Sequence, residues 1–216
     1  AIGAEKDGSE QVSFNLFGLV TARDADQTDT PAYKTDSVLV AAAAGSDATD
    51  TSLISINQAT GVVTYDRADF NSLGAGEAAI YTISFDVVSG SDTSRQTVTL
   101  TIAGENDAPV VSVVDPATGS EKDTSERVSF NLFTDLTTAH DIDRTDTSAF
   151  AAGSVIVAAL AGSDTTKTSL ISIDQATGEI SYDRAVFNFL GAGESAIYGI
   201  GFDVVSGPDR IHRVVT

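Results

Sequence analysis

The 216-residue sequence contains no cysteine, no methionine and no tryptophan, and only two histidines. Without cysteine the chain can form neither disulfides nor thiolate metal sites. Histidine is the usual catalytic base near neutral pH, but His140 and His212 do not occupy equivalent positions in the repeat described below. No nucleophile elbow or phosphate loop is present. We therefore expect the protein not to be an enzyme.

Long hydrophobic runs are also absent. No apolar stretch approaches the roughly 18 residues that a membrane-spanning helix needs, so we expect no membrane insertion. A hydrophobic content of 42% is still enough for packed cores. No signal peptide is visible, and we expect a mature, internal or otherwise exported chain.

Basic residues are scarce. The chain has 12 Lys and Arg residues and 31 Asp and Glu residues, so its net charge at pH 7 is −19. The excess of acidic residues is spread over both halves of the chain. A solubility role alone needs a net charge of only about 2 to 8. Such a surface repels nucleic acid and anionic membranes, so we expect no nucleic-acid partner. It attracts hard divalent cations, which prefer carboxylate oxygen.

An internal repeat sets the domain organisation. The motif Ser-Phe-Asn-Leu-Phe at residues 13–17 returns at residues 129–133, and further matches follow in the same order. Each copy is long enough to have its own core. We predict two tandem domains, residues 1–107 and residues 108–216, the second with its last strand truncated.

Within each copy the apolar residues alternate with polar ones, as expected of β-strands. In the first copy the predicted strands are residues 38–44, 53–56, 62–65, 80–88 and 98–102. About seven short strands per copy indicate an all-β fold of Greek-key β-sandwiches. The aromatic and aliphatic residues of one central strand in each copy should face the core: Tyr81, Ile83 and Phe85, and Tyr198, Ile200 and Phe202.

The stretch 101–109 joins the two copies. Gly104 ends a strand, Glu105, Asn106 and Asp107 follow, and Pro109 restricts the residue before it to an extended conformation. We predict that this short, rigid linker is braced by a metal ion and that a strand leaves it at residue 110. A polar turn closed by proline is the alternative interpretation.

Paired carboxylates are the candidate metal ligands. Asp24 and Asp26 in the first copy, and Asp141 and Asp143 in the second, are two residues apart and so share one side of an extended loop. The glycine and glutamate that an EF-hand loop needs are missing. Calcium takes six to eight oxygens, so ligands must come from several loops.

Further ligands are expected where loops meet if the sandwiches stack end to end. These loops carry Asp66 and Asp69 in the first copy and the acidic start of the chain with Glu5 and Glu10. Carboxylates held close together without a cation would repel one another by several kcal/mol at low dielectric. The alternative is that these Asp-rich segments are solvated turns.

The order of several motifs resembles a cadherin repeat. Leu-Ile-Ser-Ile at 53–56, Thr-Gly-Val-Val at 60–63, Asp-Arg at 66–67, the alternating strand 81–85 and Asn-Asp-Ala-Pro at 106–109 occur in that order. Together with Leu-Gly-Ala-Gly-Glu, they are still more similar to the bacterial cadherin-like repeats (VCBS type) of large secreted adhesins. The likeness covers nearly the whole chain, twice.

This resemblance implies calcium (Ca²⁺) at the junctions between repeats. Asp66 matches the aspartate of the Asp-Arg-Glu motif, Asn106 and Asp107 match the linker pair, and Asp141 and Asp143 match the Asp-x-Asp pair of the next repeat. The sequence departs from the family in having alanine where that motif has glutamate and serine where an Asp-Gly turn is usual. Asp69 is one residue that could substitute.

A two-repeat chain of this size also resembles the rhizobial Rap adhesins, lectins secreted by a type I exporter. This likeness implies a secreted, cell-surface-associated, monomeric adhesin that binds acidic bacterial polysaccharide through calcium and supports aggregation or biofilm. Against it, no tryptophan is present to stack on sugars, and Tyr33, the aromatic residue least obviously part of a strand, is better explained by loop packing. The alternative function is a passive extender of a larger adhesin, stiffened by calcium and without its own ligand.

Overall fold

The computed structural model describes residues 2–26, 28–114 and 119–216. Its regular elements are β-strands and five short 3₁₀ helices of three or four residues. Among the described residues no helix has the length and apolar character needed to cross a membrane. The predicted all-β fold is confirmed.

Internal contacts divide the chain into two compact units. Unit 1 consists of residues 1–107 and 142–145, and unit 2 of residues 108–141 and 146–216. The short segment 142–145 therefore lies in unit 1, whereas the repeat in the sequence assigns it to the second copy. Each unit has its own hydrophobic core.

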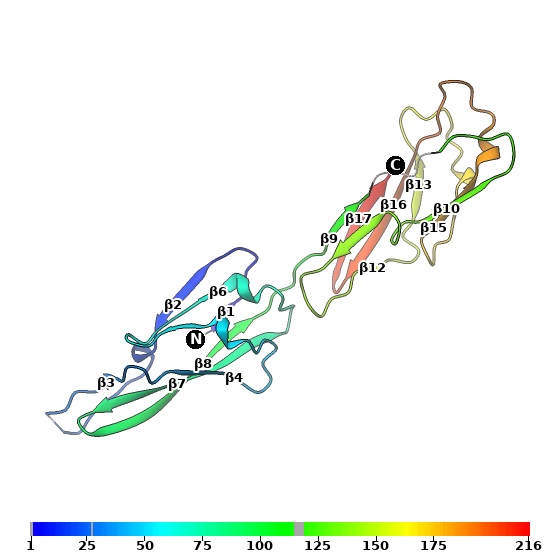
Figure 1. The fold of residues 1–216 in the computed structure, drawn as a ribbon. Helices are drawn as coiled ribbons and strands as arrows, with labels where there is room; N and C mark the ends of the chain where they lie inside the picture. The colour runs from blue at the N-terminus through cyan, green and yellow to red at the C-terminus, as the bar shows by residue number, and fades with distance from the viewer. Residues whose placement is uncertain (1, 27, 115–118) are drawn as a thin grey trace. The chain divides into compact units, whose positions relative to one another are not determined.

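Unit 1 is a sandwich of two sheets (Figure 1). The first sheet has the order β1–β8–β7–β3, with β4 also paired to β7, and the second has the order β2–β6–β5. The chain passes repeatedly from one sheet to the other, as in a Greek key. The bounds are β1 (Ile2–Ala4), β2 (Gln11–Asn15), β3 (Ala32–Tyr33), β4 (Leu39–Ala42), β5 (Ser55–Asn57), β6 (Val62–Asp66), β7 (Ala78–Ser89) and β8 (Asp92–Ala103).

Unit 2 repeats this arrangement with differences at its edges. One sheet contains β12, β16, β13 and β17, a second has the order β10–β15–β14, and β9 pairs with β11. The bounds are β9 (Val110–Val113), β10 (Arg127–Asn131), β11 (Thr137–His140), β12 (Ala149–Phe150), β13 (Ile156–Ala159), β14 (Ser172–Ile173), β15 (Glu179–Asp183), β16 (Tyr198–Ser206) and β17 (Asp209–Val215).

The core of unit 1 lies between its two sheets. Tyr81, Ile83 and Phe85 of β7 are fully buried, as their alternation in the sequence predicts. Phe70, from the 3₁₀ helix that follows β6, packs edge-on against Tyr81 with ring centroids 6.1 Å apart. The inward residues of β16 in unit 2 are buried in the same way.

Candidate metal centre

The parallel pairing of β1 with β8 places the start of the chain beside the segment that follows β8. Ala4 lies opposite Ala103, the last residue of β8. The next residue, Glu5, donates its backbone N–H to the Ala103 carbonyl at 2.8 Å. The Glu5 carboxylate in turn accepts the backbone N–H of Glu105 at 3.1 Å. The Glu5 side chain is thereby fixed beside the predicted linker.

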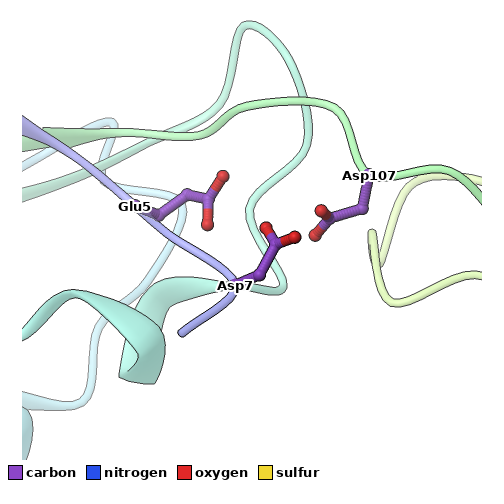
Figure 2. Close-up of side chains that lie close together, drawn as sticks. All are labelled: Glu5, Asp7 and Asp107. Carbon is purple, nitrogen blue, oxygen red and sulfur yellow. The ribbon is translucent and has the colours of Figure 1, made fainter. Parts of the chain in front are cut away.

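A close-packed acidic cluster results from this arrangement. Glu5, Asp7 and Asp107 each offer a carboxylate oxygen, and these oxygens all lie within 4.8 Å of one another. Figure 2 shows the carboxylates of Asp7 and Asp107 pointing toward each other, with Glu5 next to them. We call these three residues the acidic cluster of unit 1.

Two oxygen atoms of the cluster are buried without a donor. Glu5 is 2% exposed, and its Oε2 atom, like Oδ2 of Asp107, receives no hydrogen bond from any described residue. A buried carboxylate oxygen that lacks a donor costs free energy, because the hydration it loses is not replaced. A bound cation is one group that would replace it.

The cluster changes the acidity of its members. Burial raises the pKa of Asp107 to about 6, and the neighbouring charge and hydrogen-bonding of Asp7 add to the effect, followed by the charges of Glu5 and Asp143. Burial also raises the pKa of Glu5, although the hydrogen bond from the Glu105 backbone opposes this. These are the shifts expected where like charges meet in a poorly solvated place.

The segment 142–145 adds a further carboxylate to this part of unit 1. Asp143 is 1% exposed, and its Oδ2 atom accepts the backbone N–H of Asp107 at 3.0 Å. Arg144 forms an ion pair with Glu77, Nη2 to Oε1 at 2.8 Å, which raises the pKa of Arg144. The ion pair holds the segment against unit 1.

The donor set fits a hard cation. All the side-chain ligands are carboxylates, which calcium prefers, and two of the buried oxygens have no donor. Three carboxylates supply only part of the six to eight oxygens of a calcium site, so backbone carbonyls and water must complete it. Zinc is disfavoured, because neither histidine nor cysteine is in the cluster.

Asp107 and Glu5 are the predicted ligands that belong to the acidic cluster of unit 1. Asn106, beside Asp107, donates from its side-chain amide to the Asp107 carbonyl at 3.1 Å. Asp141 is 8% exposed and belongs to unit 2. The roles of Asn106, Asp141 and Asp143 as ligands stay predictions.

Asp66 and Glu10 have other partners in the structure. Asp66 accepts backbone N–H groups of Glu10 at 2.9 Å and Ala68 at 3.1 Å, as well as the hydroxyl of Ser9. It thereby caps the 3₁₀ helix Arg67–Phe70, and these hydrogen bonds lower its pKa. Glu10 forms ion pairs with Lys6 and Arg67, which lower its pKa.

Arg67 holds the start of the chain in place through two hydrogen bonds to its backbone. Its Nε atom donates to the Ala4 carbonyl at 2.6 Å, and its Nη2 atom donates to the Glu5 carbonyl at 3.2 Å. Unit 2 repeats the bridge, where Arg184 donates to the Ser120 carbonyl at 2.6 Å. The arginine of the Asp-Arg motif thus anchors the end of β1 and the residue that follows it, Glu5.

The remaining predicted ligands lie in turns. Asp24 accepts the backbone N–H of Asp26 at 2.9 Å, and this bond is the main cause of its lowered pKa. Such an Asx turn is typical of a loop Asp-x-Asp pair. Asp26 and Asp69 are exposed. Metal binding by these three residues also stays a prediction.

The sequence predicted ligands at Glu5 and Glu10 of the acidic start. The structure places Glu5 in the acidic cluster together with Asp7, which the sequence prediction missed. The signal was present, because Glu5 and Asp7 are two residues apart in an extended segment, the spacing that singled out the Asp-x-Asp pairs. Glu10 has basic neighbours at Lys6 and Arg67, whose effect becomes visible only in the fold.

No protein-family model and no curated protein matches the chain. Among solved structures, the chain is similar to human protocadherin-24 EC1-2, at 17% sequence identity and a TM-score of 0.33. The match covers 88% of this chain and 83% of that one. A likeness this distant assigns neither a family nor a function to this chain.

Proposed function

We propose that the protein binds calcium through the acidic cluster of unit 1 and acts outside the cell as a non-enzymatic adhesin. The observation that carries the proposal is the Glu5 carboxylate, which is 2% exposed and has an oxygen without a donor beside Asp7 and Asp107. A cation would replace the lost hydration and remove the repulsion among the three carboxylates.

The proposed ligand of the adhesin is an acidic bacterial polysaccharide. A chain with a net charge of −19 repels such a polymer, so the contact requires a divalent cation that neutralises or bridges the two. Biolayer interferometry with immobilised acidic exopolysaccharide tests this. We expect binding in calcium, loss of binding in EDTA, and no rescue by magnesium at equal ionic strength, because magnesium demands a tighter octahedral site.

A second function, that of a passive calcium-stiffened extender, is favoured by the packing of Tyr33. Its ring lies 6.3 Å from that of Phe85, and its hydroxyl donates to the Gln58 carbonyl at 2.8 Å. The ring is therefore engaged inside the unit rather than presented for stacking on a sugar. Calcium binding without affinity for any acidic polysaccharide would select the extender. Failure of calcium binding would contradict both functions.

A further inference from the structure

Arg144 attaches the segment 142–145 to unit 1 through several contacts. Two nitrogens of its guanidinium group donate to Oε1 of Glu77, Nη2 at 2.8 Å and Nε at 3.1 Å. The Nη1 atom donates to the backbone carbonyl of Asp47, and Nη2 lies 3.4 Å from the carboxylate of the same residue. The backbone N–H of Arg144 donates to the Ser72 carbonyl at 3.2 Å. The guanidinium group therefore meets two carboxylates of unit 1 at once.

Unit 1 itself holds these two carboxylates in place. The Oε2 atom of Glu77 accepts the backbone N–H of Gly74 at 3.1 Å, and Oδ2 of Asp47 accepts that of Ala78 at 2.8 Å. Unit 2 has the same bonds at the equivalent positions, from Gly191 to Glu194 at 2.7 Å and from Ser195 to Asp164 at 2.6 Å. The fold of each unit thus forms the acidic pair, so the place that receives the guanidinium group is preorganised.

Asp143 lies next to Arg144 in the chain and packs between two parts of unit 1. On one side is Gly74, where an added Cβ atom would lie 3.4 Å from side-chain atoms of Asp143. On the other side, Oδ2 of Asp143 accepts the backbone N–H of Asp107 at 3.0 Å. This placement brings the Asp143 carboxylate to the acidic cluster of unit 1, and it requires the segment 142–145 to lie on unit 1.

The charge of Asp143 acts on two members of the acidic cluster. Burial is the main cause of the raised pKa of both Asp107 and Glu5, and the charge of Asp143 adds to it. A fourth carboxylate at this place increases the repulsion in the calcium-free protein, and it supplies a further oxygen to a hard cation. The position of Asp143 therefore decides how many carboxylates the site offers.

The charge of Arg144 and its contacts have opposite effects on a calcium site in the same part of unit 1. By Coulomb's law alone a guanidinium cation repels a second cation, so the charge would weaken calcium binding. The contacts keep the segment in place before calcium arrives, and a site that is already formed binds more tightly than one that must be assembled. Removing the arginine therefore tightens calcium binding if charge dominates and weakens it if position dominates.

We propose that Arg144 is a positioning residue of the calcium site. It clamps the segment 142–145 to Glu77 and Asp47, and it thereby holds Asp143 at the acidic cluster as a fourth carboxylate. The inference rests on the proposed function, and it adds to that function the residue that completes the site. Arg144 donates to residues outside the cluster, so its effect on calcium passes through Asp143.

Isothermal calorimetry of the full chain with calcium, at constant ionic strength, compares the wild type with Arg144→Gln and Arg95→Gln. Arg95 is the matched control, because it also belongs to unit 1 and pairs with a carboxylate, that of Asp86, at 3.0 Å. The side chains of Arg95 and Arg144 are 45% and 40% exposed. We expect Arg144→Gln to weaken calcium binding at least about fivefold, the loss for a segment that is in place about a fifth of the time. Arg95→Gln changes the charge alone and should not weaken binding.

Hydrogen exchange of the Asp107 amide, measured by NMR in EDTA, reports the position of Asp143 without calcium, because this amide donates to Asp143. We expect faster exchange in Arg144→Gln than in the wild type and in Arg95→Gln. Arg144→Lys keeps the charge but lacks the planar fork that contacts both carboxylates. We expect its calcium affinity to lie between those of the wild type and Arg144→Gln.

Three results would overturn the inference, and they differ in what they mean for calcium binding. Calcium binding to the wild type that is equal or tighter in Arg144→Gln would overturn the clamp and leave the proposed function standing. Weaker binding with unchanged exchange at Asp107 would overturn the role of Asp143. No calcium binding to the wild type would contradict the proposed function, and this inference with it.

Discussion

The surroundings of Asp107 disfavour the charged form of its carboxyl group. Burial and the nearby Asp7 raise its pKa to about 6, and its Oδ2 atom has no donor among the described residues. In the absence of a cation, the charged form of this side chain therefore weakens the fold at neutral pH.

Replacing this charge should stabilise the calcium-free protein. Asp107→Asn removes one charge from the acidic cluster and provides an amide that can donate to Asp7. We expect the melting temperature of unit 1 in EDTA at pH 7.5 to rise by several degrees, since about 1 kcal/mol corresponds to about 4–8 °C in a domain of this size. Calorimetric scans measure the change.

Asp36→Asn is the matched control. Asp36 is exposed and has a positive φ of 56°, which asparagine also tolerates. The Asp36→Asn substitution changes the net charge by the same amount as Asp107→Asn, but outside the acidic cluster. An equal rise in both variants would mean that net charge, rather than the cluster, opposes folding.

The pH dependence of stability should have a specific sign. A carboxyl whose pKa is higher in the folded than in the unfolded chain binds more protons when folded, so its contribution is full at low pH and is lost as pH rises through its folded value. For Asp107 that window runs from about 4, the unfolded value, to about 6. Glu5 acts in the same direction, and its other close charges are Asp7, Glu105 and Asp143.

We therefore expect the wild type in EDTA to gain stability relative to Asp107→Asn as pH falls from 7.5 to 5. Carboxyls with lowered pKa, such as Asp66 and Asp183, lose their contribution only as pH falls through values below their ordinary range. Thermal unfolding of the two proteins over this pH range measures the difference. A difference that stayed constant with pH would contradict the account of Asp107.

At the scale of elements, Asp66 and Asp183 occupy the same position in the two units. Each caps a 3₁₀ helix by accepting the N–H of the second residue after it, at 3.1 Å for Asp66 and 3.0 Å for Asp183. Each also accepts a backbone N–H from the segment before the first strand of the second sheet, at Glu10 and at Glu126.

Asp66→Ala and Asp183→Ala should therefore lower the free energy of unfolding of their units by similar amounts. A lost cap costs about 0.5–2 kcal/mol, and the second hydrogen bond adds to it. Urea unfolding measures both variants with and without calcium. If Asp66 is a calcium ligand as the family resemblance implies, the cost of Asp66→Ala will be larger in calcium, whereas that of Asp183→Ala will not change.

Most strands of the core of unit 1 could be predicted, but β1 could not. The alternation of Tyr81, Ile83 and Phe85 predicted β7 because a half-buried strand must alternate. β1 is only three residues long and contains Gly3, so its sequence has little strand character. It forms because β8 offers a free edge for parallel pairing, a tertiary effect that no local pattern reveals.

This short strand is also why the site was predicted only in part. Asp107 lies in a recognisable linker motif, but its partners Glu5 and Asp7 reach it through the pairing of β1 with β8. Glu10 was an equally acidic choice in the sequence. In the structure it pairs with Lys6 and Arg67, and its role as a ligand stays a prediction. Ion pairing between residues far apart in the chain depends on the fold, so composition and spacing cannot predict it.

For the whole molecule, the net charge of −19 should make the calcium-free protein sensitive to salt. Self-repulsion destabilises a compact chain, and raising NaCl from about 20 mM to about 200 mM reduces the Debye length from about 20 Å to about 7 Å. We expect the melting temperature in EDTA to rise over this range. An unchanged or lower melting temperature would show that long-range repulsion does not limit stability.

The most direct test of calcium binding is isothermal calorimetry of the chain with calcium at constant ionic strength, on the wild type, Asp107→Asn and Asp36→Asn. We expect calcium to bind the wild type, with an affinity that Asp107→Asn weakens at least about tenfold, equivalent to about 1.4 kcal/mol, and that Asp36→Asn leaves unchanged. No calcium binding to the wild type, or equal affinity in all three proteins, would contradict the assignment of the acidic cluster as a calcium site.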